Sequence, residues 1–494
     1  MAEAQINFDL AALLMRTQTS AILVVIAAVY VAARLWHLTS FGLFGDEVFT
    51  LWTAGQDWNG LFASVVGDVA HPPLYYALFK VWIDIGGQSM LWIKLLPALI
   101  SIATIFPFLF LCRELNLNLI ATRLALWLMA VNGFLITHAQ EPRMYSLLLL
   151  LTTCSLWLFA RLCRQHSNSI QVALFIVNLL LVFTHYFGWV IVALELLFLL
   201  IWQRELLRWF IIGSIFIGVC FTPWVYLVAR AARANPSRVN FVWNRPPPLS
   251  ELAGYYGNLN GPLSYRWKVF GTAVVMMVFV TPIIVWAAHV IRTRGSRTAA
   301  RPLGFLSLFA FGPVALAFIA SHALPQPVWA FRYLIIAAPA YLLLVATATE
   351  RLKSRRVRIA FVVLIAGWAG VSGFVEAFNR DRVAWEPLVQ RMIQAEPDTA
   401  SAKPIAVYVT DPNIGNTVQF YLDKAGDARF QIVMSEDLTR PGSDHWWVAF
   451  IYYDHENQPL VQDSLKGAGY RVGDVIEARA ASHGALMFPV WKRQ

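Results

Sequence analysis

Long apolar runs separated by short polar connections fill the chain from about residue 20 to Phe378. A helix needs about 20 apolar residues to cross a membrane, and these runs are continuous rather than alternating, which excludes a transmembrane β-barrel. We therefore predict an α-helical polytopic membrane protein with about eleven transmembrane helices, of which the fifth and sixth are short. The expected spans are 20–38, 91–111, 124–139, 144–160, 170–184, 188–202, 209–229, 269–291, 302–321, 331–349 and 359–377.

Beyond Phe378 the chain becomes polar, and its pattern changes to that of a small α/β domain. Short runs rich in β-branched and aromatic residues predict strands, and amphipathic stretches between them predict helices. The predicted organisation is a membrane module, 1–378, followed by a soluble domain, 379–494. The strands are expected at 405–410, 430–434, 446–453 and 485–491, and the helices near 386–394, 416–422 and 460–465.

Composition supports this class, because 58% of the residues are hydrophobic and only 14% are charged. The first apolar run lacks a cleavage pattern and is expected to be retained as a span. All four cysteines lie in or beside apolar runs, so no disulfide framework is expected. The net charge of +10 is spread along the chain rather than gathered in one patch, so membrane lipids rather than nucleic acid are the expected surroundings.

Lys and Arg are concentrated in one set of the predicted connections. The opposite connection 39–90 contains only Lys80 against five acidic residues. By the positive-inside rule, the basic connections are cytoplasmic, whereas 39–90 and the soluble domain face the outer side of a cytoplasmic membrane. Fifteen Lys and Arg lie in the connections 113–123, 161–170, 203–208, 292–301 and 350–358.

This topology holds only if the segment 71–82 does not cross the membrane. A crossing there would invert every later connection, so we predict an amphipathic, interfacial juxtamembrane helix that starts at Pro72 and Pro73 and lies on the outer surface. The connection 230–268 is the exception to the charge pattern and is a candidate for contact with an anionic ligand. Its cations are Arg230, Arg233, Arg238, Arg245, Arg266 and Lys268.

Two acidic groups map to the same outer face. Asp46 and Glu47 follow the first span in a glycine-containing turn, and Glu141 lies in the polar interruption between the third and fourth spans. Carboxylates at a membrane boundary cost free energy unless they are solvated or partnered, so they often mark function. Each group alone is also consistent with an ordinary solvated loop, but the two together favour a catalytic site.

Further polar residues map near this face. Each histidine among them is, taken singly, more typical of a packing residue, and each aromatic residue of the interfacial belt. A divalent metal ion held by His71, Glu141 and His185 stays open, although no HExxH or CxxC spacing supports it, and no other cofactor is expected. The remaining candidates are Tyr75, Arg143, Tyr145, Tyr186, Arg332 and Tyr333.

These residue types suit the transfer of a sugar from a lipid phosphate. One carboxylate can take the proton of an acceptor hydroxyl or amine, and the leaving phosphate needs cations but little protonation. A glycoside hydrolase would also need an acid for its leaving group. A nucleotide-sugar enzyme would need a cytosolic nucleotide site, for which the cytoplasmic connections are too short.

Several short motifs stand in order over roughly the first 350 residues. They are Arg34-Leu35, Leu43-Phe-Gly-Asp46-Glu47, His71-Pro-Pro-Leu-Tyr-Tyr, Leu96-Pro-Ala-Leu, Gln140-Glu-Pro-Arg-Met-Tyr145, and Phe331-Arg-Tyr-Leu with Pro339.

In content and order these motifs resemble the GT-C glycosyltransferases of the family 39 type, a bacterial group that includes protein mannosyltransferase-like and lipid A aminoarabinose-transferase-like enzymes. The resemblance implies the GT-C fold, a polyprenyl-phosphate sugar donor and Asp46 as the catalytic base, with Glu47 beside it and Glu141 as the second acid. It places Arg143 and Tyr145 near the donor phosphate. Relatives often have Arg-Leu-Pro-Ser where this chain has Lys94-Leu-Leu-Pro97-Ala98. The expected donor-phosphate and substrate contacts are His71, Lys94, Arg143, Tyr145, His185, Tyr186, Arg332 and Tyr333.

The resulting prediction is an inverting glycosyltransferase. It would move a monosaccharide from a polyprenyl-phosphate donor to a lipid such as lipid A or lipopolysaccharide, to a glycan, or to a protein, on the periplasmic face. The alternative is a polytopic transporter or lipid flippase, because ionisable residues also mark transport pathways, although the sequence shows no inverted repeat. The sugar, the acceptor, the metal requirement and the oligomeric state stay open.

Overall fold

The computed structural model describes residues 21–234, 246–261, 268–292, 297–378, 383–396, 404–435, 444–453, 458–479 and 483–492. Its contacts divide the chain into two compact units. The first comprises the chain up to Trp36 together with Gln56–Ala377, and the second comprises His37–Gly55 together with the chain from Phe378 onward. The turn that carries Asp46 therefore packs with the C-terminal segment, whereas the sequence pattern placed it with the membrane module.

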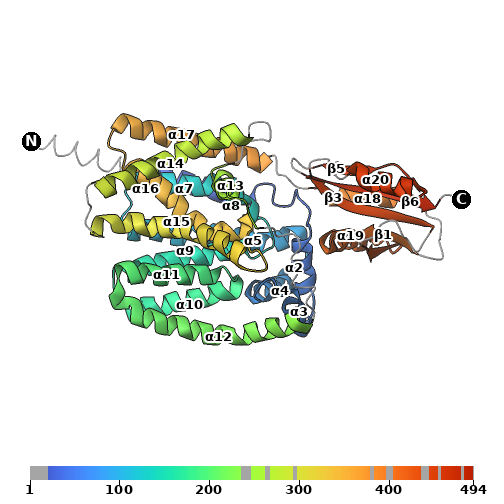
Figure 1. The fold of residues 1–494 in the computed structure, drawn as a ribbon, viewed down its shortest axis with the longest axis horizontal. Helices are drawn as coiled ribbons and strands as arrows, with labels where there is room; N and C mark the ends of the chain where they lie inside the picture. Colours follow the sequence, from blue (N-terminus) through green and yellow to red (C-terminus); the bar gives the residue numbers. More distant parts are fainter. Residues whose placement is uncertain are drawn as a thin grey trace, which may run out of the picture. The chain divides into compact units, whose positions relative to one another are not determined.

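The helices of the first unit account for the predicted spans (Figure 1). Among the described residues, seven helical segments are long and apolar enough to cross a membrane. They are Met90–Glu114 (α5, Met90–Ala103, and α6, Ile105–Glu114), Tyr145–Leu162 (α9), Arg204–Ala234 (η1 and α12, Leu207–Ala234), Ala273–Arg292 in α14 (Lys268–Arg292), Ala300–Ala323 in α15 (Arg297–Ala323), Phe331–Glu350 (η4, Phe331–Ala337, and α16, Ala338–Glu350) and Arg355–Phe378 (α17).

Shorter apolar helices complete the set. The helices α7 (Leu119–Val131) and α8 (Gly133–Ala139) are bent by 55° relative to each other and together make a broken span. The three other short apolar helices are Ala21–Leu35, α10 (Asn168–Thr184) and α11 (Gly188–Trp202). Each of the eleven predicted spans thus corresponds to one or more helices among the described residues, which confirms the α-helical polytopic fold. The contacts of α9 with α6 and α10, and of α16 with α7 and α15, join these helices into one bundle.

The break between α7 and α8 lies at Asn132 and is closed by polar side chains. Asn132 caps α8 by accepting from the Leu135 amide at 3.0 Å, and its amide nitrogen donates to the Leu259 carbonyl. The fully buried Arg34 guanidinium donates to the carbonyls of Met129 and Ala130, both at 2.9 Å. The last carbonyls of a helix have no N–H partner within it, so Arg34 supplies the hydrogen-bond donors that these carbonyls lack.

Helix α4 (Leu74–Gly86) corresponds to the predicted juxtamembrane helix, and it begins directly after Pro72 and Pro73. One face buries Tyr75, Tyr76 and Phe79, while the opposite face exposes apolar side chains. Its 13 residues are too few for a span, so it does not disturb the expected topology. Its position at the membrane surface stays a prediction.

Parts of the basic connection 230–268 are described. They include the end of α12 with Arg230 and Arg233, and α13 (Ser250–Leu259). The other cations proposed there to contact an anion, namely Arg238, Arg245, Arg266 and the side chain of Lys268, lie outside the described residues.

The second unit contains a mixed sheet in the order β2-β1-β3-β6-β4, with β5 paired to β6. The strand β1 is parallel to β2 and β3, and β6 is antiparallel to β3. All four predicted strands and all three predicted helices are present, whereas the very short β4 and β5 and the helix α2 (Asp46–Ala54) of this unit were not predicted. The elements are β1 (Ile405–Val409), β2 (Phe430–Met434), β3 (His445–Tyr453), β4 (Tyr470–Val472), β5 (Ile476–Arg479), β6 (His483–Lys492), α18 (Trp385–Ala395), α19 (Pro412–Ala425) and α20 (Gln458–Gly467).

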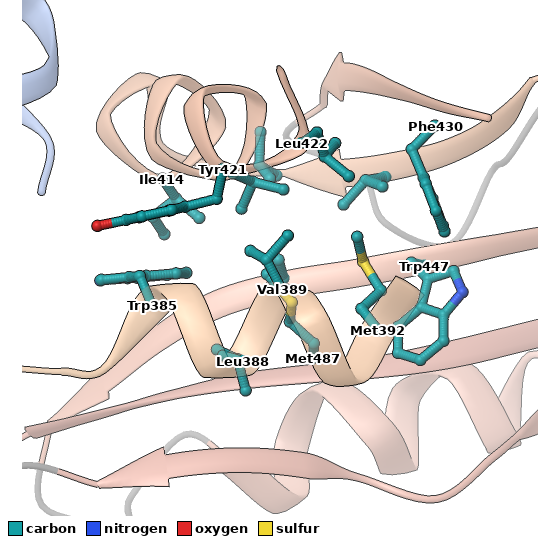
Figure 2. Close-up of a cluster of buried hydrophobic side chains, with 14 of the residues drawn as sticks. Trp385, Leu388, Val389, Met392, Ile414, Tyr421, Leu422, Phe430, Trp447 and Met487 are labelled. Carbon is teal, nitrogen blue, oxygen red and sulfur yellow. The ribbon is translucent and has the colours of Figure 1, made fainter. Parts of the chain in front are cut away.

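Helices α18 and α19 bury one face of this sheet. Figure 2 shows Trp385 and Tyr421 at one end of the resulting cluster and Phe430 and Trp447 at the other. The Tyr421 hydroxyl points away from the apolar side chains. The opposite face of the sheet buries a second cluster that includes Leu465 of α20.

A polar triad lies inside the helical bundle, where Glu195 of α11 meets Ser155 of α9 and Asn178 of α10. The Ser155 hydroxyl lies 2.7 Å from both Asn178 Oδ1 and Glu195 Oε1, and the Asn178 amide donates to Glu195 Oε2 at 2.7 Å. One hydroxyl can donate to only one acceptor. All three hydrogen bonds are therefore made when the buried Glu195 carboxyl carries a proton and donates it to Ser155.

We expect Glu195→Gln to be tolerated, because its amide nitrogen can donate to Ser155 and its carbonyl can accept from Asn178. Glu195→Ala should lower the free energy of unfolding by about 2 kcal/mol, because it leaves buried polar groups without partners. Thermal unfolding of the detergent-solubilised protein measures both effects. Equal destabilisation by Gln and Ala would contradict the protonated triad.

Candidate functional site

Three rings from distant segments meet in the first unit. The His71 ring centroid lies 5.5 Å from that of His185 and 6.1 Å from that of Tyr333, and His185 and Tyr333 are 4.7 Å apart. The guanidinium carbon of Arg332 lies 5.6 Å from the Tyr333 ring centroid. The positive charges of Arg143 and Arg332 both act on His185. These five predicted site residues therefore form one group, which we call the cationic cluster.

The turn before His71 is held in an unusual conformation. Val69 has a φ of 54°, which is costly for a β-branched residue. The Tyr186 hydroxyl donates to the Val69 carbonyl at 3.3 Å and accepts from the Trp224 indole at 3.2 Å. His71 lies 3.6 Å from the Asp68 carboxylate. Tyr186 therefore supports the backbone that presents His71.

His185 lies between α10 and α11, outside both helices. Its Nδ1 accepts from the Phe187 amide at 3.1 Å, so in the neutral ring the proton is on Nε2. Burial lowers the pKa of His185 well below its ordinary value, and the charges of His71, Arg143 and Arg332 lower it further. His185 is thus a neutral donor, and its buried Nε2 meets no hydrogen-bond partner among the described residues.

Arg143 follows the turn at the end of α8 and is 3% exposed. Its guanidinium donates to the Tyr76 hydroxyl of α4 at 3.2 Å. Two residues earlier, Glu141 Oε2 lies 2.6 Å from Nδ1 of His138, and the His138 ring is 5.0 Å from that of Tyr145. The predicted residues Glu141 and Tyr145 thus gather around His138.

A cavity of about 340 Å³ adjoins both groups. It lies among α8, α13, the start of η4 and the end of α17. Glu376 accepts from the Thr137 hydroxyl at 3.0 Å, and a Cβ at Gly133 would collide with the Glu376 side chain, so glycine lets α8 and α17 approach here. The lining residues include Phe134, Thr137, His138, Asn258, Arg332 and Glu376.

The other predicted residues lie elsewhere. Lys94 is buried within α5 in the first unit. Asp46 and Glu47 begin α2 (Asp46–Ala54) in the second unit. The Glu47 carboxylate accepts from the Phe44 amide at 3.0 Å and so closes its own turn, whereas Asp46 is half-buried at the first helical position.

Metal ligands are not grouped in the part of the chain that the structure describes. No three His, Cys, Asp or Glu side chains there are arranged to hold an ion. Glu141 pairs with His138 instead of joining His71 and His185, so the trio considered from the sequence does not form a site.

Solved structures resemble this chain. ArnT from Cupriavidus metallidurans bound to undecaprenyl phosphate matches 95% of this chain and 98% of its own with a TM-score of 0.54 and 14% identity. The chain has the GT-C fold. ArnT in the apo state matches 97% of this chain and 98% of its own, with a TM-score of 0.52 and 14% identity. No protein-family model and no curated protein sequence matches.

The GT-C fold brings together residues that sequence motifs alone did not select. Glu376 was missed although it is an acid within the last predicted span, which is itself an unusual signal. Tyr76 closes the motif that begins at His71 but was not singled out, and Asn258 had no signal, because each gains its place only through contacts between distant helices.

The stability of the protein should depend on pH through His185. The pKa of this residue is lowered in the folded state, so stability is complete above the unfolded pKa of about 6.5 and falls as the pH drops below it, by up to about 1.4 kcal/mol per pH unit. Thermal unfolding between about pH 7.5 and 5 should show a smaller loss for His185→Gln than for the wild type. An unchanged loss would contradict the assignment, and exposed His289→Gln is the control.

Proposed function

We propose that this protein is an inverting glycosyltransferase that transfers a monosaccharide from a polyprenyl-phosphate donor. The observation that carries the proposal is the cationic cluster beside a cavity of sugar size, in a fold shared with ArnT, which was solved with undecaprenyl phosphate bound. We further propose that the acceptor is a lipid such as lipid A, a glycan or a protein on the periplasmic face, as the motif resemblance and the charge distribution suggest.

The cationic cluster fits the phosphate of the donor. Arg143 and Arg332 supply positive charge, and the neutral His185 offers an Nε2–H donor. Charge-assisted hydrogen bonds to phosphate oxygens are about twice as strong as neutral ones, especially where water is excluded. Because His185 stays neutral, it adds a donor without adding a third cation to a buried site. The same groups stabilise the negative charge that the phosphate gains as it leaves.

The cavity fits the sugar of the donor. Arg332 belongs to the cationic cluster and also lines the cavity, so a sugar bonded to a phosphate at Arg332 would enter it. A volume of about 340 Å³ is at the small end for ligand sites and suits one sugar ring. Glu376, Thr137 and Asn258 provide polar contacts for its substituents.

Asp46 is the proposed base. It takes the proton of the acceptor hydroxyl or amine while the acceptor oxygen or nitrogen forms a bond to the anomeric carbon. The bond from that carbon to the phosphate oxygen breaks, and its electron pair leaves on the phosphate. Attack in line with the leaving group inverts the anomeric configuration. No acid is required, because a phosphate leaves as an anion.

Sugar transfer by the purified enzyme tests this proposal. We expect wild type to transfer sugar from at least one member of a panel of polyprenyl-phosphate sugars to a membrane-lipid extract, and Asp46→Asn to reduce the rate by about 100-fold or more. Unchanged transfer by a folded Asp46→Asn variant would remove Asp46 as the base. Well-folded wild type that transfers no lipid-linked sugar would instead favour a transporter or flippase.

Glu376→Gln should weaken recognition of the donor sugar. The amide keeps the size of the side chain but loses its charge, so we expect the KM for the donor to rise about tenfold. Gly367→Ala on the same helix is the control, because a Cβ there meets no atom within 4 Å. Steady-state kinetics with the active donor measure both, and an unchanged KM in Glu376→Gln would place the sugar elsewhere.

A further inference from the structure

The turn before Asp46 is built into the C-terminal unit. Residues 37–55 cluster with the chain beyond Phe378, although more than 320 residues separate the two stretches in sequence. The Gly45 amide donates to the Thr417 hydroxyl of α19 at 2.8 Å, and the Tyr421 hydroxyl of α19 donates to the Leu43 carbonyl at 3.0 Å. One helix thus holds the turn on both sides of Phe44.

The Thr417 hydroxyl is oriented for this contact. It donates to the Asn413 carbonyl one helical turn earlier at 2.6 Å, so its lone pair is presented to the Gly45 amide. Gly45 has a φ of 45°, and a Cβ there would lie 3.1 Å from Asn413 Cβ. Glycine is therefore favoured at this position both by conformation and by the close approach of α19.

The Tyr421 contact is equally restrictive. A Cβ at Gly42 would overlap the Tyr421 hydroxyl, so this glycine allows the backbone to reach the tyrosine. Phe44 stacks on Trp385 of α18 with centroids 5.7 Å apart and planes 7° apart. Trp385 and Tyr421 are both members of the apolar cluster in Figure 2, so the turn rests on the core of this unit.

The charge of Asp46 acts on the start of α19. Asp411 caps that helix by accepting from the Asn413 amide at 2.7 Å. Its pKa is raised chiefly by burial and additionally by the negative charge of Asp46. The Asp46 carboxylate is therefore within electrostatic reach of α19.

We infer that the C-terminal unit positions the catalytic base, and that Thr417 and Tyr421 are the positioning residues that fix the turn carrying Asp46. This inference rests on the proposed function, in which Asp46 activates the acceptor. It gives the soluble unit a role in the reaction itself, beyond any role in acceptor binding. Both residues act through the backbone at Leu43 and Gly45, not through contact with substrate.

The full-length enzyme with Thr417→Val tests the inference. Valine keeps the shape but cannot accept from the Gly45 amide, so we expect kcat to fall about tenfold or more, with little change in the KM for the donor, because misplacing a catalytic group by about 1 Å can cost about 100-fold. Thr417→Ser should restore kcat, because it retains the hydroxyl. Gln419→Ala, on the exposed face of α19, is the control for the helix.

A second pair of variants separates positioning from folding. Gly42→Ala should lower kcat through its overlap with the Tyr421 hydroxyl, and Tyr421→Phe, which removes that hydroxyl, should recover part of the loss in the double variant. Wild-type kcat in a folded Thr417→Val, or equal losses in Thr417→Val and Thr417→Ser, would overturn the inference while the proposed function stands. Inactive wild type would overturn both.

Discussion

The first unit depends on the break between α7 and α8, where the fully buried Arg34 donates hydrogen bonds to carbonyls that have no partner within the helix. Isolating a guanidinium from water is costly unless its donors are satisfied, and Arg34 meets carbonyls of α7, the Tyr30 carbonyl and the Ser101 hydroxyl. Its own carbonyl accepts from Gln140, at the end of α8. The bend is therefore fixed at both ends. His138 lines the cavity as a result, and the chain continues through Glu141 and Arg143 into α9.

The first unit also brings two arginines close to His185, because the charges of Arg143 and Arg332 both act on it. Arg143 is buried, and burial holds the neighbouring His185 neutral. Positive charges held together in a partly desolvated site repel one another, and the proposed donor phosphate would reduce that repulsion. Glu376 and Arg332 both line the cavity. A donor with a phosphate at one end and hydrogen-bonding substituents at the other matches this division of charge.

Local pattern predicted the helices and the longer strands, because hydrophobic periodicity records which face of each element is buried. It missed β4 and β5, which have three and four residues. Nor does local pattern show that the Tyr186 hydroxyl bonds to Val69 and Trp224, so the role of Tyr186 toward substrate stays a prediction. The cluster of His71, His185 and Tyr333 was predicted only as residues on one face. Their contacts join segments that lie more than 100 residues apart, and no local pattern encodes such pairings.

The same limit explains the largest difference between sequence and structure, which concerns Asp46. Hydropathy places its turn directly after the first span, so the pattern assigned it to the membrane module. Two glycines, Gly42 and Gly45, instead admit α19 to within hydrogen-bonding distance of the backbone, and the turn becomes part of the soluble fold. The groups proposed to bind the donor phosphate thus belong to the first unit and the proposed base to the second. Under the proposed function, the C-terminal unit contributes to the reaction through the turn that carries Asp46.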